Sequence, residues 1–177
     1  MDTLGCHIVL SAYGQWLPGD RRGHWSSAFD EQLGYTQPHQ LHPGDPVRER
    51  MAREIMSHPA TRFTRTMITA ITDSIGQCAK ESNWQLSAFT VEPTHAHLLI
   101  TFSDRPFANT VKWIKQCSTR AVHQQTNHAG PVWCVGSWRT IISDGPRWNN
   151  TMKYIQRHNE RRGLPASPYD FVTPLAY

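Results

Sequence analysis

Two histidines stand one residue apart in EPTHAHLLITF, which covers residues 92–102. The run is rich in aliphatic and β-branched residues and predicts a β-strand, on which every second side chain points to the same face. His95 and His97 are therefore neighbours on one face, while Ala96 and Leu98 point toward the core. Two neutral imidazoles on a rigid strand can bind one divalent metal ion. Taken alone, however, a pair of partly buried structural histidines explains this pattern better.

A third histidine lies on a predicted C-terminal helix, GPRWNNTMKYIQRHNERRG (145–163). The apolar stripe of this helix consists of Trp148, Met152 and Ile155. Tyr154 is not on the stripe, because it lies about 100° around the helix from Ile155. It shares a polar face with Asn150 and His158, which lie one turn before it and one turn after it. His158 could therefore complete a metal site with the two strand histidines.

A tyrosine beside a metal site could attack a phosphodiester. A neutral phenol with a pKa of about 10 is a poor nucleophile, so the phosphate must be made more electrophilic. A divalent ion bound to a non-bridging phosphate oxygen would do this and would stabilise the charge of the transition state. Attack by Tyr154 would give a covalent phosphotyrosine, which conserves the bond energy for a later rejoining step. Strand transfer needs such an intermediate, whereas hydrolysis does not.

Basic and aromatic residues stand where they could hold nucleic acid. The net charge is +4, a modest excess that is compatible with a polyanionic partner. We expect the DNA-binding side chains to be Arg147, Lys153, Arg157, Arg161 and Arg162 on the last helix, Lys112 and Lys115 on a middle helix, and Arg21, Arg22 and Trp25 in a long loop. A solvated surface loop explains the last three equally well. We interpret Trp133 and Trp138 as core or interface residues.

The elements that must position these residues alternate between strands and helices. Strands are predicted at 7–13, 83–93, 94–102 and within 131–144, and helices at 63–78, 106–121 and 145–163. Two strand–helix–strand units of this kind predict an α+β fold: a ferredoxin-like antiparallel sheet with helices packed on one face, plus the C-terminal tyrosine helix. We expect a single domain over residues 1–177, with a long loop insertion at about 14–59 that contains one short helical stretch.

Cysteine spacing and hydropathy bear on the compartment. The four cysteines are scattered and form neither a zinc-ribbon pattern nor a redox pair. No run approaches the roughly 20 apolar residues that a membrane helix requires, and the N-terminus lacks the pattern of a signal peptide. We therefore expect a cytoplasmic protein with no membrane partner.

Two motifs carry a resemblance to a known family. THAHLLI resembles the histidine–hydrophobe–histidine signature of HUH endonucleases. YIQRHNERRG resembles the tyrosine helix of the single-tyrosine transposases, the insertion-sequence and REP-associated tyrosine transposase group. YGQWLPGD, after the first strand, is similar to an N-terminal stretch in one branch of that group. The resemblance covers most of the chain and is weakest between Gly23 and His58.

The resemblance implies a metal-dependent single-stranded DNA endonuclease and strand transferase. His95 and His97 match the paired metal ligands, and Tyr154 matches the nucleophile that holds the DNA 5′ end and leaves a free 3′-OH. The family's third ligand is commonly glutamine or asparagine, whereas this chain has His158, which favours manganese or softer ions over magnesium. The implied cofactor is Mg²⁺ or Mn²⁺. The implied partners are hairpin-containing single-stranded DNA and a second copy of the chain in a homodimer.

Other functions stay open at this point. A domesticated relative could bind DNA hairpins without cutting them, although binding alone requires neither the tyrosine nor the histidines. A phosphoesterase with two His-x-Thr/Ser motifs is a further class, but this chain offers one close histidine pair. His7 could neighbour the site, and we interpret Glu92 as a turn residue, with the alternative that it orients an imidazole. His39 and His42 have no recognisable third ligand in their loop, so we expect no second metal site there.

Overall fold

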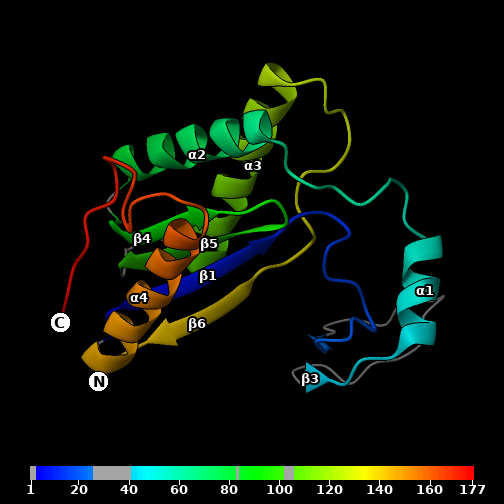
Figure 1. Cartoon of the computed structure of the whole chain (residues 1–177), viewed down its shortest axis with the longest axis horizontal. Helices are drawn as coiled ribbons and strands as arrows, with labels where there is room; N and C mark the ends of the chain where they lie inside the picture. The colour runs from blue at the N-terminus through cyan, green and yellow to red at the C-terminus, as the bar shows by residue number, and fades with distance from the viewer. Residues whose placement is uncertain (1–2, 26–40, 83, 102–105) are drawn as a thin grey trace.

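A computed structural model describes residues 3–25, 41–82, 84–101 and 106–177. Its main sheet has four strands, β1 (Gly5–Ser11), β4 (Leu86–Val91), β5 (His95–Thr101) and β6 (Trp138–Ile142), in the order β4-β5-β1-β6. Each strand is antiparallel to its neighbours. One helix connects β5 to β6, and another precedes β4 (Figure 1). This is the ferredoxin-like arrangement that the sequence predicts, so the α+β fold class is confirmed.

Two helices, α2 (Arg65–Lys80) and α3 (Phe107–Gln125), pack against each other over one face of this sheet (Figure 1). The fully buried strand residues on this face include Ile8, Leu10, Ala96, Leu98 and Ile100. Side chains alternate along a strand, so the residues between them point to the opposite face. That second face carries His95 and His97.

The second face is covered by α4 (Gly145–Arg161), the predicted tyrosine helix. Asp144 caps this helix, because its carboxylate accepts a hydrogen bond from the Arg147 amide at 2.8 Å. The predicted apolar stripe, Trp148, Met152 and Ile155, packs against Ala88, Leu99 and Ile142. Each such buried side chain contributes about 1.5–3 kcal/mol. The stripe therefore fixes the rotation of α4 about its axis, and with it the direction of Tyr154.

The segment after α4 returns along β4 and holds the helix in place. The Thr173 amide donates to the Leu86 carbonyl at 2.9 Å. The indole N–H of Trp148 donates to the Leu175 carbonyl at 2.7 Å, and its ring packs edge-on against Tyr177. Trp148 is thus held from both sides, by the sheet and by the C-terminal segment.

The predicted long loop is partly folded. It contains α1 (Pro46–Glu54), which is the expected short helix, and a small two-stranded sheet of β2 (His24–Trp25) and β3 (Leu41–His42) that the sequence reading did not predict. This insert lies to one side of the main sheet (Figure 1). His39 lies outside the described residues.

The strand predicted within 131–144 is shorter than expected. Only Trp138–Ile142 forms β6, while Trp133 makes an isolated bridge with Ala12. Trp133 is a core residue as predicted, and its indole N–H donates to the Ser118 hydroxyl at 3.0 Å. No helix in the described part of the chain is both long enough and apolar enough to cross a membrane.

Candidate functional site

Three histidines from two elements meet on the second face of the sheet. β5 supplies His95 and His97, and α4 supplies His158. Each offers one ligand atom, and these atoms all lie within 4.8 Å of one another. The ring centroids are 4.7 Å apart for the two strand histidines and 4.9 Å apart for His97 and His158. The structure thus brings together the residues that the sequence selected as a metal site.

The C-terminal half of α4 is anchored so that His158 reaches the strand histidines. The Asn159 side chain is 1% exposed and donates to the carbonyls of Phe89 and Ala166, both at 2.9 Å. Arg162, at the end of the helix, donates to the Val91 carbonyl. These bonds tie the last turn of α4 to β4, next to the turn that leads into β5.

Each site histidine has one ring nitrogen engaged by a neighbour. His97 Nδ1 is 3.0 Å from His7 Nε2, and His95 Nδ1 is 3.0 Å from the Thr94 hydroxyl. His158 Nδ1 is hydrogen-bonded to the Glu92 carboxylate. A partner on Nδ1 holds the ring in position and, by accepting the Nδ1 proton, leaves the lone pair on Nε2.

The remaining nitrogens fit a metal ion. Nε2 of His97 and Nε2 of His158 are buried without a hydrogen-bond partner among the described residues. His95 Nε2 lies 3.8 Å from the second oxygen of Glu92. Each buried nitrogen without a hydrogen-bond partner lowers the stability of the fold by about 1–3 kcal/mol. Two such nitrogens in one site therefore indicate that the site binds a ligand. Three imidazole nitrogens with a nearby carboxylate suit a divalent transition metal.

Burial keeps the imidazoles of His7, His95 and His97 neutral. It lowers the pKa of His97 to about 2, with smaller contributions from the neighbouring histidines. It lowers the pKa of His7 to about 4, helped by His158, and it lowers the pKa of His95. A neutral imidazole has a free lone pair, so these rings are in the protonation state that metal binding requires.

Tyr154 lies directly beside the cluster. Its ring centroid is 4.7 Å from that of His158 and 5.5 Å from that of His97. The side chain is nevertheless 47% exposed, because the apolar stripe of α4 turns it away from the sheet core. A groove of about 580 Å³ borders it and is lined by His7, Asp144, Pro146, Arg147, Asn150, Thr151 and Tyr154. Tyr154 and the histidines it contacts belong to the same chain.

The predicted DNA-binding residues separate into groups. Arg147, Lys153, Arg157 and Arg161 are exposed on α4, and Arg147 lines the groove. Arg162 is engaged with the Val91 carbonyl. Lys112 and Lys115 lie on α3, across the sheet from the histidines, and the Lys115 ammonium donates to the carbonyls of Cys134 and Gly136. In the insert, Arg21 and Arg22 are exposed, and Trp25 is part of β2.

The sequence is compatible with more than one role for two residues of the site, His7 and Glu92. His7 lies on β1, where the register places Val9 opposite His97 and His7 opposite Leu99, so its ring shares their face. Glu92 is indeed a turn residue, with its amide bonded to the His95 carbonyl at 2.7 Å. It also orients His158, so both interpretations of Glu92 hold. The sequence places His7 on the first strand. It does not show which residues of β5 lie opposite that strand, so it could not show that His7 reaches His97.

Replacing Glu92 with glutamine should weaken metal binding. A carboxylate that accepts from Nδ1–H makes the imidazole more basic, and loss of such a partner typically costs about 10–100-fold in affinity. We expect the Kd of the metal-free protein for Mn²⁺ to rise by that factor in Glu92→Gln, measured by calorimetric titration. Glu160→Gln, which changes an exposed carboxylate on α4, should leave the Kd unchanged. Equal affinity in Glu92→Gln and wild type would show that Glu92 does not support the metal site.

The chain is similar to known proteins in its sequence and in its fold. A family model described as "Transposase IS200 like" matches residues 55–158, which include the three histidines and Tyr154. A solved REP-associated tyrosine transposase bound to a REP hairpin is similar over 96% of this chain and 76% of its own, with a TM-score of 0.53 and 14% sequence identity. A candidate transposase from Deinococcus radiodurans R1 aligns over 89% of this chain and 92% of its own, at 16% identity and a TM-score of 0.44. No curated protein matches the chain.

Proposed function

This chain belongs to the IS200-like transposase family, and we propose that it cleaves and rejoins single-stranded DNA with Tyr154 as the nucleophile. One observation carries the proposal: a half-exposed tyrosine lies beside a cluster of three imidazoles, in which the buried Nε2 atoms of His97 and His158 have no hydrogen-bond partner in the described part of the chain. DNA binding alone does not require this combination. It therefore favours a cutting enzyme over a protein that only holds DNA hairpins.

His95, His97 and His158 would hold one divalent ion through their Nε2 atoms. When bound, such an ion polarises the scissile phosphate and stabilises the charge that develops on its non-bridging oxygens. Burial keeps His95 and His97 neutral, and the three rings are held by His7, Thr94 and Glu92. They therefore need little reorganisation during the reaction, which is what preorganised electrostatic catalysis requires.

Tyr154 would form the covalent intermediate. Its hydroxyl oxygen bonds to phosphorus while the bond from phosphorus to the 3′ oxygen breaks. The phenol loses one proton and the departing 3′ oxygen gains one, so the products are a 5′-phosphotyrosine and a free 3′-OH. Because one phosphoester is exchanged for another, the step is readily reversible and a second 3′-OH can attack the intermediate to rejoin strands.

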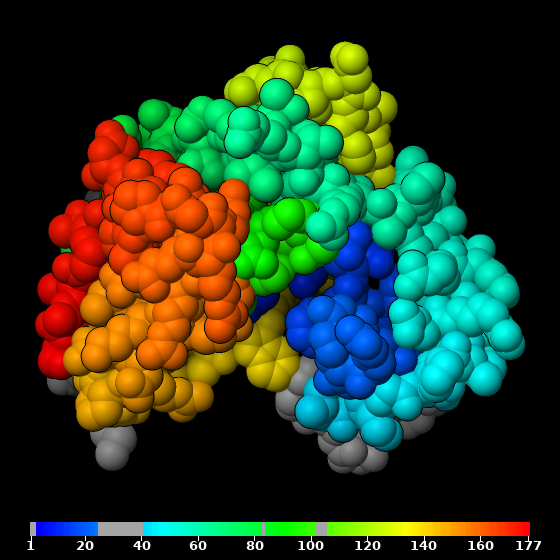
Figure 2. Space-filling view, viewed as in Figure 1, coloured from blue at the N-terminus to red at the C-terminus, as the bar shows by residue number. Residues whose placement is uncertain are grey.

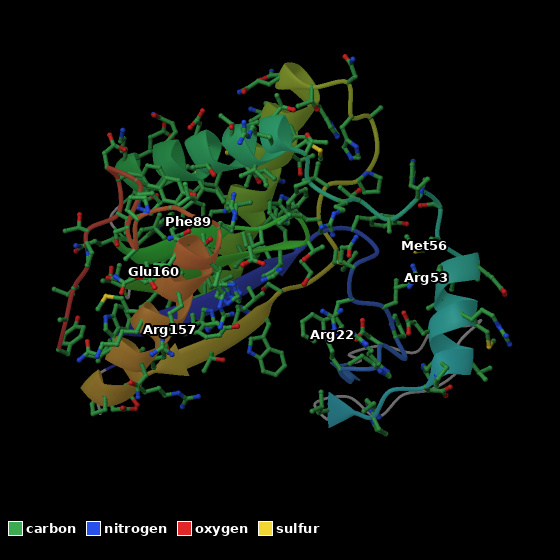
Figure 3. All side chains as sticks on the ribbon, viewed as in Figure 1. Arg22, Arg53, Met56, Phe89, Arg157 and Glu160 are labelled. Atoms are coloured by element: carbon green, nitrogen blue, oxygen red, sulfur yellow. The ribbon has the colours of Figure 1, made fainter. Side chains whose placement is uncertain are left out.

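The exposed basic residues of α4 would hold the DNA backbone. Arg147 lines the groove beside Tyr154, and Lys153 is exposed on the same helix. Arg157 is exposed on this helix as well (Figure 3). We propose that the bound DNA contains a hairpin, as the hairpin in the REP-associated transposase structure suggests. A homodimer stays a prediction. The described chain carries tyrosine and histidines together, so one chain has the residues for a single cleavage.

A trapping experiment tests the proposal. The protein would be incubated with Mn²⁺ and labelled hairpin oligonucleotides from the flanks of its own gene, then denatured and digested with protease. We expect a DNA-linked peptide, identified by mass spectrometry, in which the phosphate is attached to Tyr154. DNA that is bound but never cut with any divalent ion would support the binding-only alternative. Cutting with DNA attached to no residue would indicate hydrolysis and contradict the proposal.

A further inference from the structure

The motif YGQWLPGDRRG (13–23) has no role in the site described so far. It begins where β1 ends, beside the metal ligands: Ser11 pairs with His95, and the Ala12 amide donates to the Thr94 carbonyl at 2.8 Å. Gly19 has a φ of 90° and lies so close to the backbone of Asp45 and Glu49 that a Cβ would not fit. The motif is therefore a defined turn that packs against the start of α1.

This turn brings the side chains of Trp16 and Arg22 together as a stacked pair. The Arg22 guanidinium carbon lies 4.3 Å from the centroid of the Trp16 ring. The Trp16 indole N–H donates to the Gly23 carbonyl at 2.7 Å, which fixes the plane of the ring. Arg22 is fixed as well, because its Nε and Nη2 donate to the Asp20 carboxylate at 2.7 and 2.6 Å.

The pair is exposed although both of its members are immobilised. Trp16 is 44% exposed and Arg22 has half of its side chain in solvent, while Asp20 is 8% exposed. A tryptophan whose only role was to stabilise the turn would be expected in its interior. The insert instead buries a carboxylate and leaves the indole outside. Hydrogen bonds from Arg22 lower the pKa of Asp20, so the carboxylate is ionised and neutralises the guanidinium.

This arrangement changes what Arg22 can recognise. The sequence predicts Arg22 as a DNA-binding residue, but two of its three nitrogens are committed to Asp20, and Nη2 also donates to the Gln15 carbonyl at 2.9 Å. Few of its N–H groups are therefore free for the two parallel hydrogen bonds with which arginine usually binds a phosphate. What the pair offers is a flat, rigid aromatic surface. Every nucleobase can stack on such a surface.

The pair also lies near the reacting groups. Figure 2 shows a hollow between α4 and the blue part of the insert, with green atoms from the region of the β4–β5 hairpin at its base. In Figure 3, Arg22 lies on the side of the insert that faces the sheet. α4, which carries Tyr154 and the exposed basic residues, lies on one side of this hollow, and the insert, which carries the Trp16–Arg22 pair, lies on the other.

We propose that the Trp16–Arg22 pair is a stacking site for one unpaired base of the DNA strand whose phosphate is attacked by Tyr154. The proposal rests on the proposed function. The α4 side would then hold phosphates through charge, and the insert would hold a base through stacking. A strand that spans the hollow would be fixed at two points, which positions its phosphodiester over the histidines.

Binding in the absence of cleavage tests the stacking site independently of catalysis. In a Tyr154→Phe background, fluorescence anisotropy would compare two labelled probes of equal charge: the oligonucleotide dT12 and a 12-mer of abasic residues. We expect dT12 to bind about 5- to 150-fold more tightly, the range for one stacked base. Trp16→Ala should remove most of this ratio, whereas Trp16→Phe should keep most of it. Lys153→Ala, which removes an exposed charge on α4, should weaken both probes alike.

The controls separate stacking from folding. Val47→Ala, at an exposed position of α1 in the same insert, should leave both affinities unchanged, and all variants should unfold at similar temperatures. The proposal would be overturned if Trp16→Ala kept the ratio of the dT12 affinity to the abasic affinity, which includes the case in which it lowered both affinities by the same factor. It would also be overturned if Trp138→Ala alone removed the ratio, since Trp138 is an exposed tryptophan on the sheet itself. A Tyr154 adduct formed by the Trp16→Ala protein at saturating DNA would show that the catalytic proposal stands regardless.

Discussion

A Tyr154→Phe protein is expected to bind single-stranded DNA as well as wild type does and to cut it at least about 10³-fold more slowly, because loss of a nucleophile removes the covalent route. The substitution deletes one oxygen atom and keeps the ring, so the contacts with His158 and His97 at 4.7 and 5.5 Å remain. Since the residue is 47% exposed, the free energy of unfolding should change by no more than about 0.5 kcal/mol.

The measurement is a single-turnover cleavage assay on denaturing gels, with Mn²⁺ and an excess of protein over labelled hairpin DNA. Tyr177→Phe is the matched control, because Tyr177 is 52% exposed and also contacts α4. It should cut at the wild-type rate and form the usual adduct. A denaturation-resistant adduct in Tyr154→Phe would mean that another residue is the nucleophile, and the assignment of α4 as the tyrosine helix would be wrong.

The arrangement of Tyr154 and the histidines was predictable because it depends on local periodicity. The period of two along 95–97 places two imidazoles on one face of a strand. The apolar stripe of α4 then leaves one orientation for the helix, in which Tyr154 is outward and His158 is toward the strand histidines. The order of the predicted elements limits the sheet to a few topologies, and the ferredoxin-like one is observed.

The partners of the imidazoles were not predictable with the same certainty. His7 reaches His97 only because β1 lies between β5 and β6 in one register, and a shift of one residue would turn His7 to the other face. The Glu92–His158 bond joins residues 66 positions apart, and it depends on how α4 crosses the sheet. The contacts of Lys115 were not predictable from the sequence either. A lysine off the apolar stripe was assigned to DNA, yet its ammonium is engaged by the backbone carbonyls of Cys134 and Gly136.

His158→Gln is expected to change which metal the protein uses. Three imidazoles favour Zn²⁺, Co²⁺ or Mn²⁺ over Mg²⁺, which prefers oxygen ligands and retains water. Glutamine can keep the hydrogen bond to Glu92 through its amide N–H while its carbonyl oxygen replaces the imidazole nitrogen. We expect the affinity for Zn²⁺ to fall by a factor on the order of 100, since exchanging an imidazole ligand for a weaker amide oxygen should cost at least as much as losing a partner that orients a ligand.

Two measurements on the metal-free protein check this expectation: competition titrations with Zn²⁺ and Mn²⁺, and cleavage rates with Mn²⁺ and with Mg²⁺. In wild type the Mn²⁺ rate should exceed the Mg²⁺ rate, and in His158→Gln the two rates should approach each other, because one oxygen ligand has been added. His123→Gln is the control, since His123 is exposed on α3, outside the metal cluster. Unchanged affinity and unchanged metal preference in His158→Gln would show that His158 is not a ligand. The short distance between His158 and His97 would then reflect only the packing of α4 on the sheet, and the ion would have to be held by His95, His97 and Glu92.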